Sequence, residues 1–185
     1  MNILRYALLA SLMMLTGCAS FGILSTSDKT LTQKYTNETS RYVQIDNLTF
    51  HYQDEGTGPT IVLLHGVASS LHTWDGWVKE LRPHYRIIRI DLPGHGLTGP
   101  DSSRKEYDIA YMTDMLNKLL VRIGVEKAHF AGNSLGGYIA WNYAIEHPEK
   151  VDKLVLLDAA GYPQKMPFIM SFAAWPVVGE MSQIF

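Results

Sequence analysis

The chain carries the hexapeptide Gly132-Asn133-Ser134-Leu135-Gly136-Gly137 between a strand predicted at 127–131 and a helical pattern at 135–146. A Gly-x-Ser-x-Gly pattern at a strand-to-helix junction predicts a very sharp turn, in which side chains two residues either side of the serine would collide. Gly132 and Gly136 fit that need. The turn projects the Ser134 hydroxyl from the C-terminal edge of a sheet, and the Leu135 N–H opens a helix whose positive dipole end favours a developing oxyanion. We predict Ser134 as a nucleophile; the bare pattern also fits a glycine-rich turn that merely joins strand to helix.

The rest of the chain alternates between strand and helix patterns. A strand pair is predicted at 42–52 around an Asp46-Asn47 turn. Continuous apolar runs predict strands buried on both faces, and apolar residues at helical spacing predict the intervening helices. This order predicts an α/β fold with a mostly parallel sheet and helices on both faces. Buried strands are predicted at 60–64 and 85–92, further strands at 127–131 and 153–157, and the helices at 71–82, 109–123 and 135–146.

Two further loops follow buried strands. Gly66, in Leu64-His65-Gly66-Val67, lets the backbone turn across the top of the sheet, so the Val67 N–H is the natural second oxyanion donor. His65 is interpreted as a structural histidine rather than a general base. Asp91-Leu92-Pro93-Gly94-His95-Gly96 follows the next strand, and we interpret it as loop geometry rather than chemistry.

In order and spacing, these three motifs resemble those of the α/β-hydrolase family over about residues 42–163. Gly-Asn-Ser-Leu-Gly-Gly is most similar to the capped serine hydrolases: esterases, lipases and carbon–carbon bond hydrolases. Haloalkane dehalogenases and epoxide hydrolases share the scaffold but carry an aspartate where Ser134 stands, so those chemistries are disfavoured. The resemblance implies that Ser134 attacks a carbonyl, that a histidine takes its proton, and that the Val67 and Leu135 N–H groups hold the oxyanion. No metal-ligand spacing or phosphate-binding loop is present, so we expect no cofactor and no metal.

The catalytic histidine and acid break the family pattern. The family order is Ser, acid, His, and the one histidine after Ser134 is His147. It lies 13 residues further along the predicted helix, about 20 Å away at the rise of an α-helix, and is interpreted as part of an exposed helix end. None of the earlier histidines matches a family catalytic position. Asp158 follows the sixth strand and is either the acid or only a loop cap.

After Asp158, 27 residues remain, too few for the family's later strands and histidine loop. Residues 166–178 are strongly apolar and resemble the first segment of the cap, although they fit equally a core segment without its packing partner. We therefore expect the N-terminal portion of a longer protein, truncated after the sixth strand at the start of the cap. The predicted organisation is a signal at 1–18, a tether at 19–40, the core at 41–163 and the start of a cap at 164–185.

The N-terminus predicts export. Arg5 precedes an apolar run at 7–16 that is too short to span a membrane. Leu15-Thr16-Gly17-Cys18 resembles the bacterial lipoprotein box, which implies lipidation of Cys18; an ordinary cleaved signal is the alternative. Ala19 after the cysteine favours the periplasmic face of the outer membrane. Because Cys18 is the sole cysteine, no intramolecular disulfide can form.

Composition narrows the function. The chain has 185 residues, 46% hydrophobic and 18% charged, with a formal net charge of −2. Nucleic acid is therefore excluded as an expected partner. The leading hypothesis is a lipase- or carboxylesterase-like hydrolase of a small apolar ester, inactive as this chain alone. The alternatives are a carbon–carbon bond hydrolase of the same fold and a non-catalytic remnant. Neither substrate identity nor oligomeric state follows from the sequence.

Overall fold

A computed structural model of the chain describes residues 28–104 and 106–162. The chain divides into two compact units, of which Thr36–Tyr162 contains the sheet. The eight-residue helix α2 (Asp28–Tyr35) belongs to the other unit. The range predicted as a tether, 19–40, therefore contains a helix. The predicted signal, Cys18 and the predicted cap segment lie outside the described residues.

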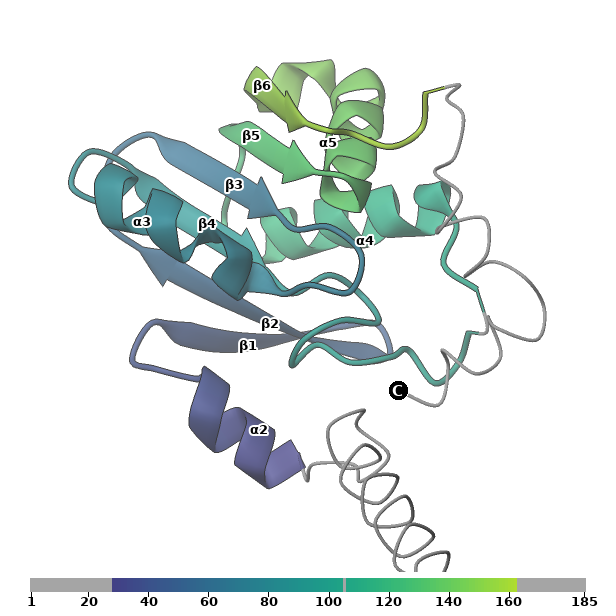
Figure 1. The fold of residues 1–185 in the computed structure, drawn as a ribbon. Helices are drawn as coiled ribbons and strands as arrows, with labels where there is room; N and C mark the ends of the chain where they lie inside the picture. The colour runs from purple at the N-terminus through teal and green to yellow at the C-terminus, as the bar shows by residue number, and fades with distance from the viewer. Residues whose placement is uncertain (1–27, 105, 163–185) are drawn as a thin grey trace, which may run out of the picture. The chain divides into compact units, whose positions relative to one another are not determined.

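A six-stranded sheet forms the centre of the larger unit, in the order β1-β2-β4-β3-β5-β6 (Figure 1). Strands β4, β3, β5 and β6 are mutually parallel, whereas β2 runs antiparallel to both β1 and β4. The prediction of a mostly parallel sheet is confirmed. The bounds are β1 Ser40–Ile45, β2 Leu48–Glu55, β3 Thr60–Leu64, β4 Arg86–Ile90, β5 Ala128–Asn133 and β6 Val151–Leu157.

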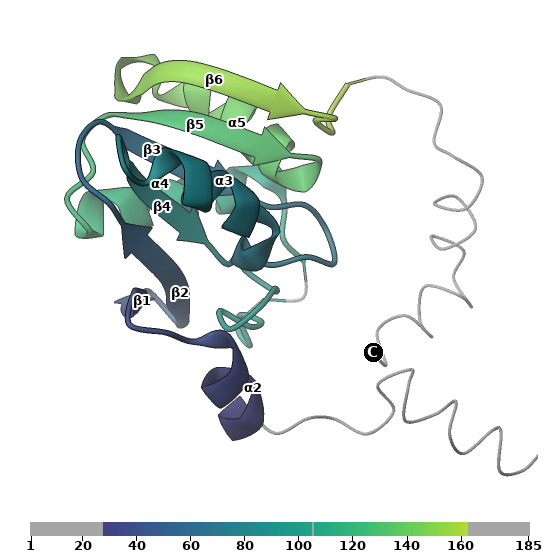
Figure 2. The same ribbon diagram turned by 60° about the vertical axis from the view of Figure 1, so that its left-hand side comes forward.

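Helices cover both faces of this sheet, as predicted. α3 (Asp75–Leu81) lies on one face, and α4 (Ile109–Arg122) and α5 (Leu135–Glu146) lie on the other (Figures 1 and 2). The helix predicted at 71–82 is divided into a 3-10 turn, η1 (Leu71–Trp74), and α3. A second 3-10 turn, η2 (Pro148–Lys150), leads from α5 into β6.

Alternate residues of the central strands fill two separate cores. Val62 and Leu64 of β3 pack on the α4–α5 side, whereas Leu63 packs on the α3 side with Trp74 and Val78. All three β3 residues are fully buried. Both faces of β3 therefore need apolar side chains, which is why its sequence lacks the polar alternation of a half-exposed strand. Packing on both faces fixes the position of β3 in the sheet. It therefore also fixes where the loop after β3 begins.

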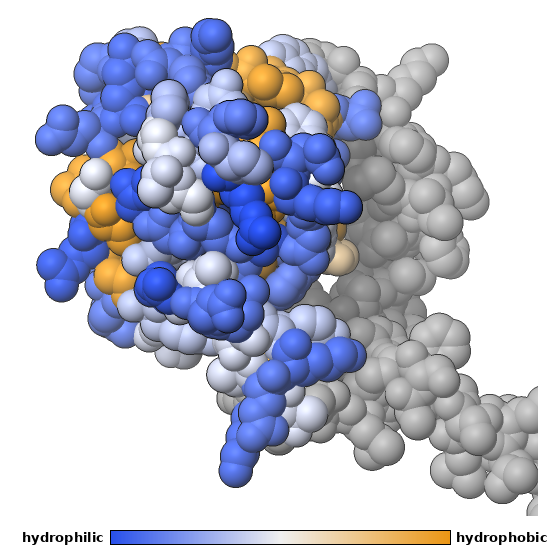
Figure 3. Space-filling model, turned by 90° about the vertical axis from the view of Figure 1, so that its left-hand side faces the viewer, coloured by the Kyte–Doolittle hydropathy of each residue, from blue (hydrophilic) through white to orange (hydrophobic). Residues whose placement is uncertain are grey.

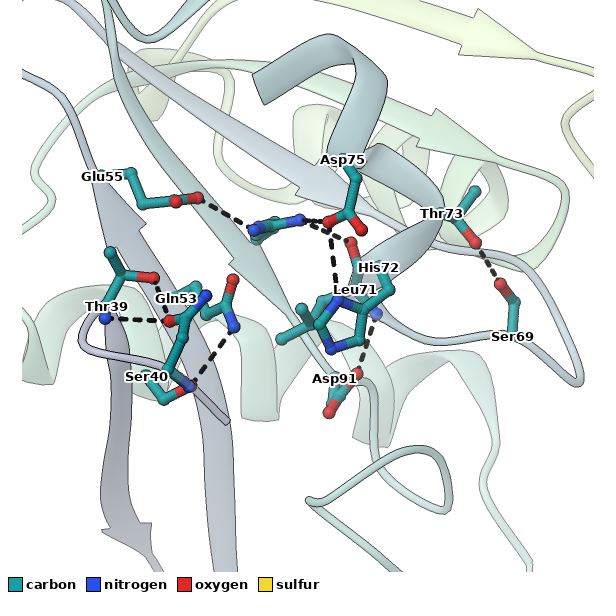
Figure 4. Close-up of polar contacts among 12 residues, drawn as sticks. Thr39, Ser40, Gln53, Glu55, Ser69, Leu71, His72, Thr73, Asp75 and Asp91 are labelled. Atoms are coloured by element: carbon teal, nitrogen blue, oxygen red, sulfur yellow. Dashed lines mark hydrogen bonds and ion pairs between the residues drawn. The ribbon is translucent and has the colours of Figure 1, made fainter. Parts of the chain in front are cut away.

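An ion-pair cluster around the buried Arg89 side chain joins α3 to the strands. Arg89 of β4 has 5% of its side chain exposed and pairs with Glu55 at 3.1 Å and with Asp75 of α3. Figure 4 shows Glu55 and Asp75 on opposite sides of the guanidinium group with which both form ion pairs. A cavity of about 360 Å³ beside this cluster is lined mainly by charged side chains. Figure 3 shows one face of the molecule, where hydrophilic side chains predominate and hydrophobic ones form small separate patches. Over the described ranges, no helix combines the length and apolarity needed to cross a membrane.

Candidate active site

Ser134 stands alone between β5, which ends at Asn133, and α5, which begins at Leu135. Its backbone has φ 50° and ψ −112°, a conformation that residues with a side chain rarely adopt. Hydrogen bonds on both sides hold it there: its N–H donates to Leu157 at 3.0 Å, and its carbonyl accepts from Tyr138 and Ala160, each at 3.0 Å. Strain of this kind persists only where the surroundings over-determine it. The position is therefore a built elbow rather than a flexible turn.

The glycines around the elbow are required by close backbone approaches. A Cβ at Gly132 would lie 2.3 Å from the Gly136 carbonyl oxygen, and one at Gly136 would lie 2.1 Å from that of Leu64. A Cβ at Gly66 would lie 3.2 Å from the Ser134 Cβ, which shows how near the β3 loop comes to the serine. The predicted collision between side chains is thus a collision with backbone. The close backbone approach at these glycines allows the C-terminal ends of β3 and β5 to lie together. This is where the strand order reverses, the position at which open α/β sheets bind ligands.

His65 orients the peptide that carries the Val67 N–H. Its Nδ1 donates to the Gly66 carbonyl at 2.7 Å, and its Nε2 accepts from the Leu92 N–H at 3.1 Å. Burial lowers the pKa of His65, which favours this neutral form. Because the peptide bond is trans, the Val67 N–H points opposite to the carbonyl that His65 holds. His65 is thus structural, as predicted from the sequence, and it faces the Val67 N–H away from the core.

Two backbone donors flank the serine without acceptors. Within the described ranges, no hydrogen-bond acceptor lies on the Val67 N–H or on the Leu135 N–H. Leu135 is the first residue of α5, so its N–H also lies at the positive end of the helix dipole. Val67 is 65% exposed. Two unpaired N–H donors near a serine with a strained backbone are the groups from which oxyanion sites for acyl transfer are built.

No histidine within the described ranges hydrogen-bonds to the Ser134 hydroxyl. His51 and His65 are buried and bonded elsewhere, and Nδ1 of His95 contacts the Pro93 carbonyl at 3.0 Å. His147 caps the C-terminal end of α5 and packs against Tyr143, with ring centroids 4.8 Å apart. The prediction that His147 lies at the helix end and away from Ser134 agrees with these bounds. The general base is therefore not assigned to any of these residues.

Asp158 follows β6 in a positive-φ conformation, with φ 46°, and is exposed. Its neighbour Leu157 accepts the Ser134 N–H, so the backbones of the two sites are adjacent. No described residue is hydrogen-bonded to the Asp158 carboxylate. The two interpretations made from the sequence, acid or loop cap, both stay predictions.

The sequence reasoning missed the role of Asp91, which it assigned to loop geometry alone. Its carboxylate accepts His51 Nδ1 at 2.8 Å, the Leu71 N–H at 2.8 Å and the Leu97 N–H at 2.9 Å. Burial would raise the pKa of Asp91, but the hydrogen bonds from His51, Leu71 and Leu97 outweigh it and lower the pKa. The sequence does not set His51 apart, because Thr49 and Gln53 on the same face of the strand are polar too. In the structure, a Cβ at Gly96 would lie 2.2 Å from the Asp91 carboxyl carbon.

Comparison with known proteins agrees with this architecture. The family model described as the alpha/beta hydrolase fold matches residues 59–185. The chain is 31% identical over 153 residues to a 2-hydroxy-6-oxononadienedioate/2-hydroxy-6-oxononatrienedioate hydrolase of Comamonas testosteroni, covering 76% of this chain and 50% of the relative. The chain spans half or less of the length of the curated relatives it matches.

Two solved structures are also similar. The structure of Cfl2 from Burkholderia cenocepacia has a TM-score of 0.70 and 28% identity, covering 77% of this chain and 53% of that one. A bacterial membrane phospholipase A has a TM-score of 0.67 and 30% identity, covering 90% of this chain and 55% of that one. The strand order, the helices on both faces and the matched family model lead to one conclusion: the chain belongs to the alpha/beta hydrolase fold family.

Proposed function

We propose that Ser134 is the nucleophile of a serine hydrolase that cleaves a carboxylic ester. The observation that carries the proposal is the strained Ser134 elbow beside the unpaired Val67 and Leu135 N–H groups. The Ser134 oxygen adds to the ester carbonyl while its proton passes to a general base. The carbonyl oxygen becomes negative beside the two N–H groups, the alcohol leaves with a proton, and water releases the acid from the acyl-enzyme.

The geometry requires very little movement of the protein during this step. The backbone of Ser134 is held by three hydrogen bonds, and the Gly66–Val67 peptide is held by His65. Donors that are already oriented cost no reorganisation when charge develops, which is the main source of oxyanion stabilisation. No described residue is hydrogen-bonded to Ser134 as a general base, so the proposal concerns the complete active site.

An apolar ester is the substrate class that we favour, as in lipases and carboxylesterases. The similarity to a membrane phospholipase A, which extends over 90% of this chain, supports an ester of the lipase class. The second candidate is hydrolysis of a carbon–carbon bond next to a ketone, which uses the same serine. The similarity to the Comamonas hydrolase supports it.

We also propose that the complete protein is exported and anchored through a lipidated Cys18, at the periplasmic face of the outer membrane. The supporting observation is the Leu-Thr-Gly-Cys box after a short apolar run. Incorporation of labelled palmitate into the chain, and its loss in Cys18→Ser, would support the anchor. Incorporation that persists in Cys18→Ser would contradict it.

A fluorophosphonate probe tests the nucleophile directly, because it forms a covalent bond with an activated serine. We expect the probe to attach to Ser134 of the complete protein, as located by peptide mass spectrometry. Attachment to the 185-residue chain as well would exclude a non-catalytic remnant. Short p-nitrophenyl esters and a dienoic keto-acid, supplied separately, then distinguish the ester from the carbon–carbon substrate. A chain that neither reacts with the probe nor turns over either substrate would favour the third interpretation, a non-catalytic remnant.

A further inference from the structure

The loop that carries Val67 is fastened at both ends to the two residues that directly follow β4. At its start, His65 accepts the Leu92 N–H at 3.1 Å. At its end, the Leu71 N–H donates to the Asp91 carboxylate at 2.8 Å, a contact visible in Figure 4. Residues between these two points have no regular secondary structure, and Ala68 has φ 53°. The position of Val67 therefore depends on where Asp91 and Leu92 hold the ends of its loop.

Asp91 is itself held from two other directions. His51 of β2 donates from Nδ1 at 2.8 Å, and the Leu97 N–H donates at 2.9 Å. Both side chains of the pair are buried, with 0% of His51 and 2% of Asp91 exposed. The carboxylate thus joins β2, the loop after β4 and the loop after β3. Charge-assisted hydrogen bonds of this kind are shorter and stronger than neutral ones.

We propose that Asp91, oriented by His51, is a positioning residue for the oxyanion donor Val67. The proposal rests on the proposed function, because it assigns Asp91 to the reaction through the Val67 N–H and not through contact with substrate. A donor displaced by about 1 Å can cost on the order of a hundredfold in rate. Loss of the Leu71 anchor would free one end of the loop while the elbow at Ser134 keeps its own hydrogen bonds.

The test compares Asp91→Asn with Asp54→Asn in the complete protein. Asp54, also in the β2–β4 region, binds Arg86 at 2.9 and 2.7 Å but makes no contact with the Val67 loop among the described residues. Two quantities are measured: amide hydrogen exchange in peptides covering 65–74 and 128–146, and the fluorophosphonate reaction at Ser134, resolved into its maximal rate and its half-saturating probe concentration.

For Asp91→Asn we expect exchange in 65–74 to rise by about tenfold, since a charge-assisted hydrogen bond is lost. Exchange in 128–146 should stay unchanged. The maximal rate of reaction should fall by about tenfold or more, while the half-saturating concentration changes by less than about twofold, because only the transition-state interaction is weakened. Asp54→Asn should change neither quantity.

Several outcomes would overturn the positioning role: unchanged exchange in 65–74, an unchanged maximal rate, or equal effects of both variants. If Asp91→Asn does not fold, His51→Gln, which removes one donor and keeps the carboxylate, is judged by the same criteria. If the unmodified complete protein does not react with the probe, the proposed function fails. Exchange in 65–74 then judges the anchor by itself, and unchanged exchange in Asp91→Asn overturns it.

Discussion

Ser134 and Ser40 both stand in settings that suggest nucleophilic chemistry, and they differ in what surrounds the hydroxyl. Ser40 Oγ lies 3.1 Å from His51 Nε2, and His51 Nδ1 lies 2.8 Å from Asp91, in the order of a Ser-His-Asp triad. Ser134 has no histidine bonded to it among the described residues. By connectivity alone, Ser40 would be the better candidate for a nucleophile.

The surroundings reverse that ranking. Ser40 Oγ also accepts the Asn37 N–H and the Gln53 side-chain N–H, each at 3.2 Å, so its hydrogen-bonding capacity is used within the fold. Ser134 lies on a strained elbow with two unpaired N–H groups nearby. A reactive serine needs free lone pairs on its oxygen and N–H donors for the oxyanion in addition to a histidine base. The lone pairs of the Ser40 oxygen already accept the Asn37 and Gln53 N–H groups.

The largest expected effect is the difference in fluorophosphonate reactivity between variants of the two serines. Ser134→Ala should abolish reaction with a fluorophosphonate, a loss of at least about a thousandfold, because it removes the attacking oxygen. Ser40→Ala should keep the rate within about threefold of the unmodified chain. The measurement is the rate of probe incorporation in purified variants. Reaction that survives in Ser134→Ala and disappears in Ser40→Ala would invert the comparison.

The next effect concerns how tightly the elbow is built. Gly136→Ala places a Cβ 2.1 Å from the Leu64 carbonyl oxygen, and backbone on both sides leaves no room to relax. We expect a loss of about 3 kcal/mol in the free energy of unfolding. Gly76→Ala is the matched control, since nothing lies within 4 Å of its Cβ position in α3. It should gain about 0.5–1 kcal/mol from better helix propensity. Urea denaturation measures both, and equal behaviour of the two variants would show that the elbow tolerates a side chain.

Within the hydrogen-bonded network of Ser40, His51 and Asp91, removing the charged residue should lower the free energy of unfolding more than removing the neutral one. Asp91→Ala leaves buried His51 and two N–H groups without an acceptor, and should cost about 3 kcal/mol or more in the free energy of unfolding. Ser40→Ala removes one neutral partner and should cost about 1 kcal/mol. Urea denaturation of the two variants checks this order. A larger loss in Ser40→Ala than in Asp91→Ala would show that the serine contributes more to stability than the carboxylate does.

The sequence predicted regular patterns better than contacts between loops. The bounds of α5 are those predicted, and the strand at 60–64 is β3, because two-sided burial produces an uninterrupted apolar run. The Gly-x-Ser-x-Gly elbow was also readable, since close backbone approach permits only glycine. The hydrogen bonds from Asp91 to His51 and Leu71 were not readable, because they join residues 40 and 20 positions apart in the chain. No local pattern encodes such partners, and His51 lies between Thr49 and Gln53, which are also polar, on one face of its strand.

The smallest expected effect is the pH dependence of stability that arises from Asp91. Its pKa in the folded chain lies below the ordinary value of 3.8, so the folded form binds this proton less readily than the unfolded form does. The resulting stability is fully present above the unfolded pKa and is lost as pH falls through the lower folded pKa. The free-energy gap between the unmodified chain and Asp91→Asn should therefore be constant above about pH 5 and narrow below about pH 4. Denaturation curves at a series of pH values check this. A gap that stays constant into stronger acid would mean that the pKa of Asp91 is the same in the folded and unfolded chain, and a gap that widens would mean that the folded network binds a neutral acid rather than an anion.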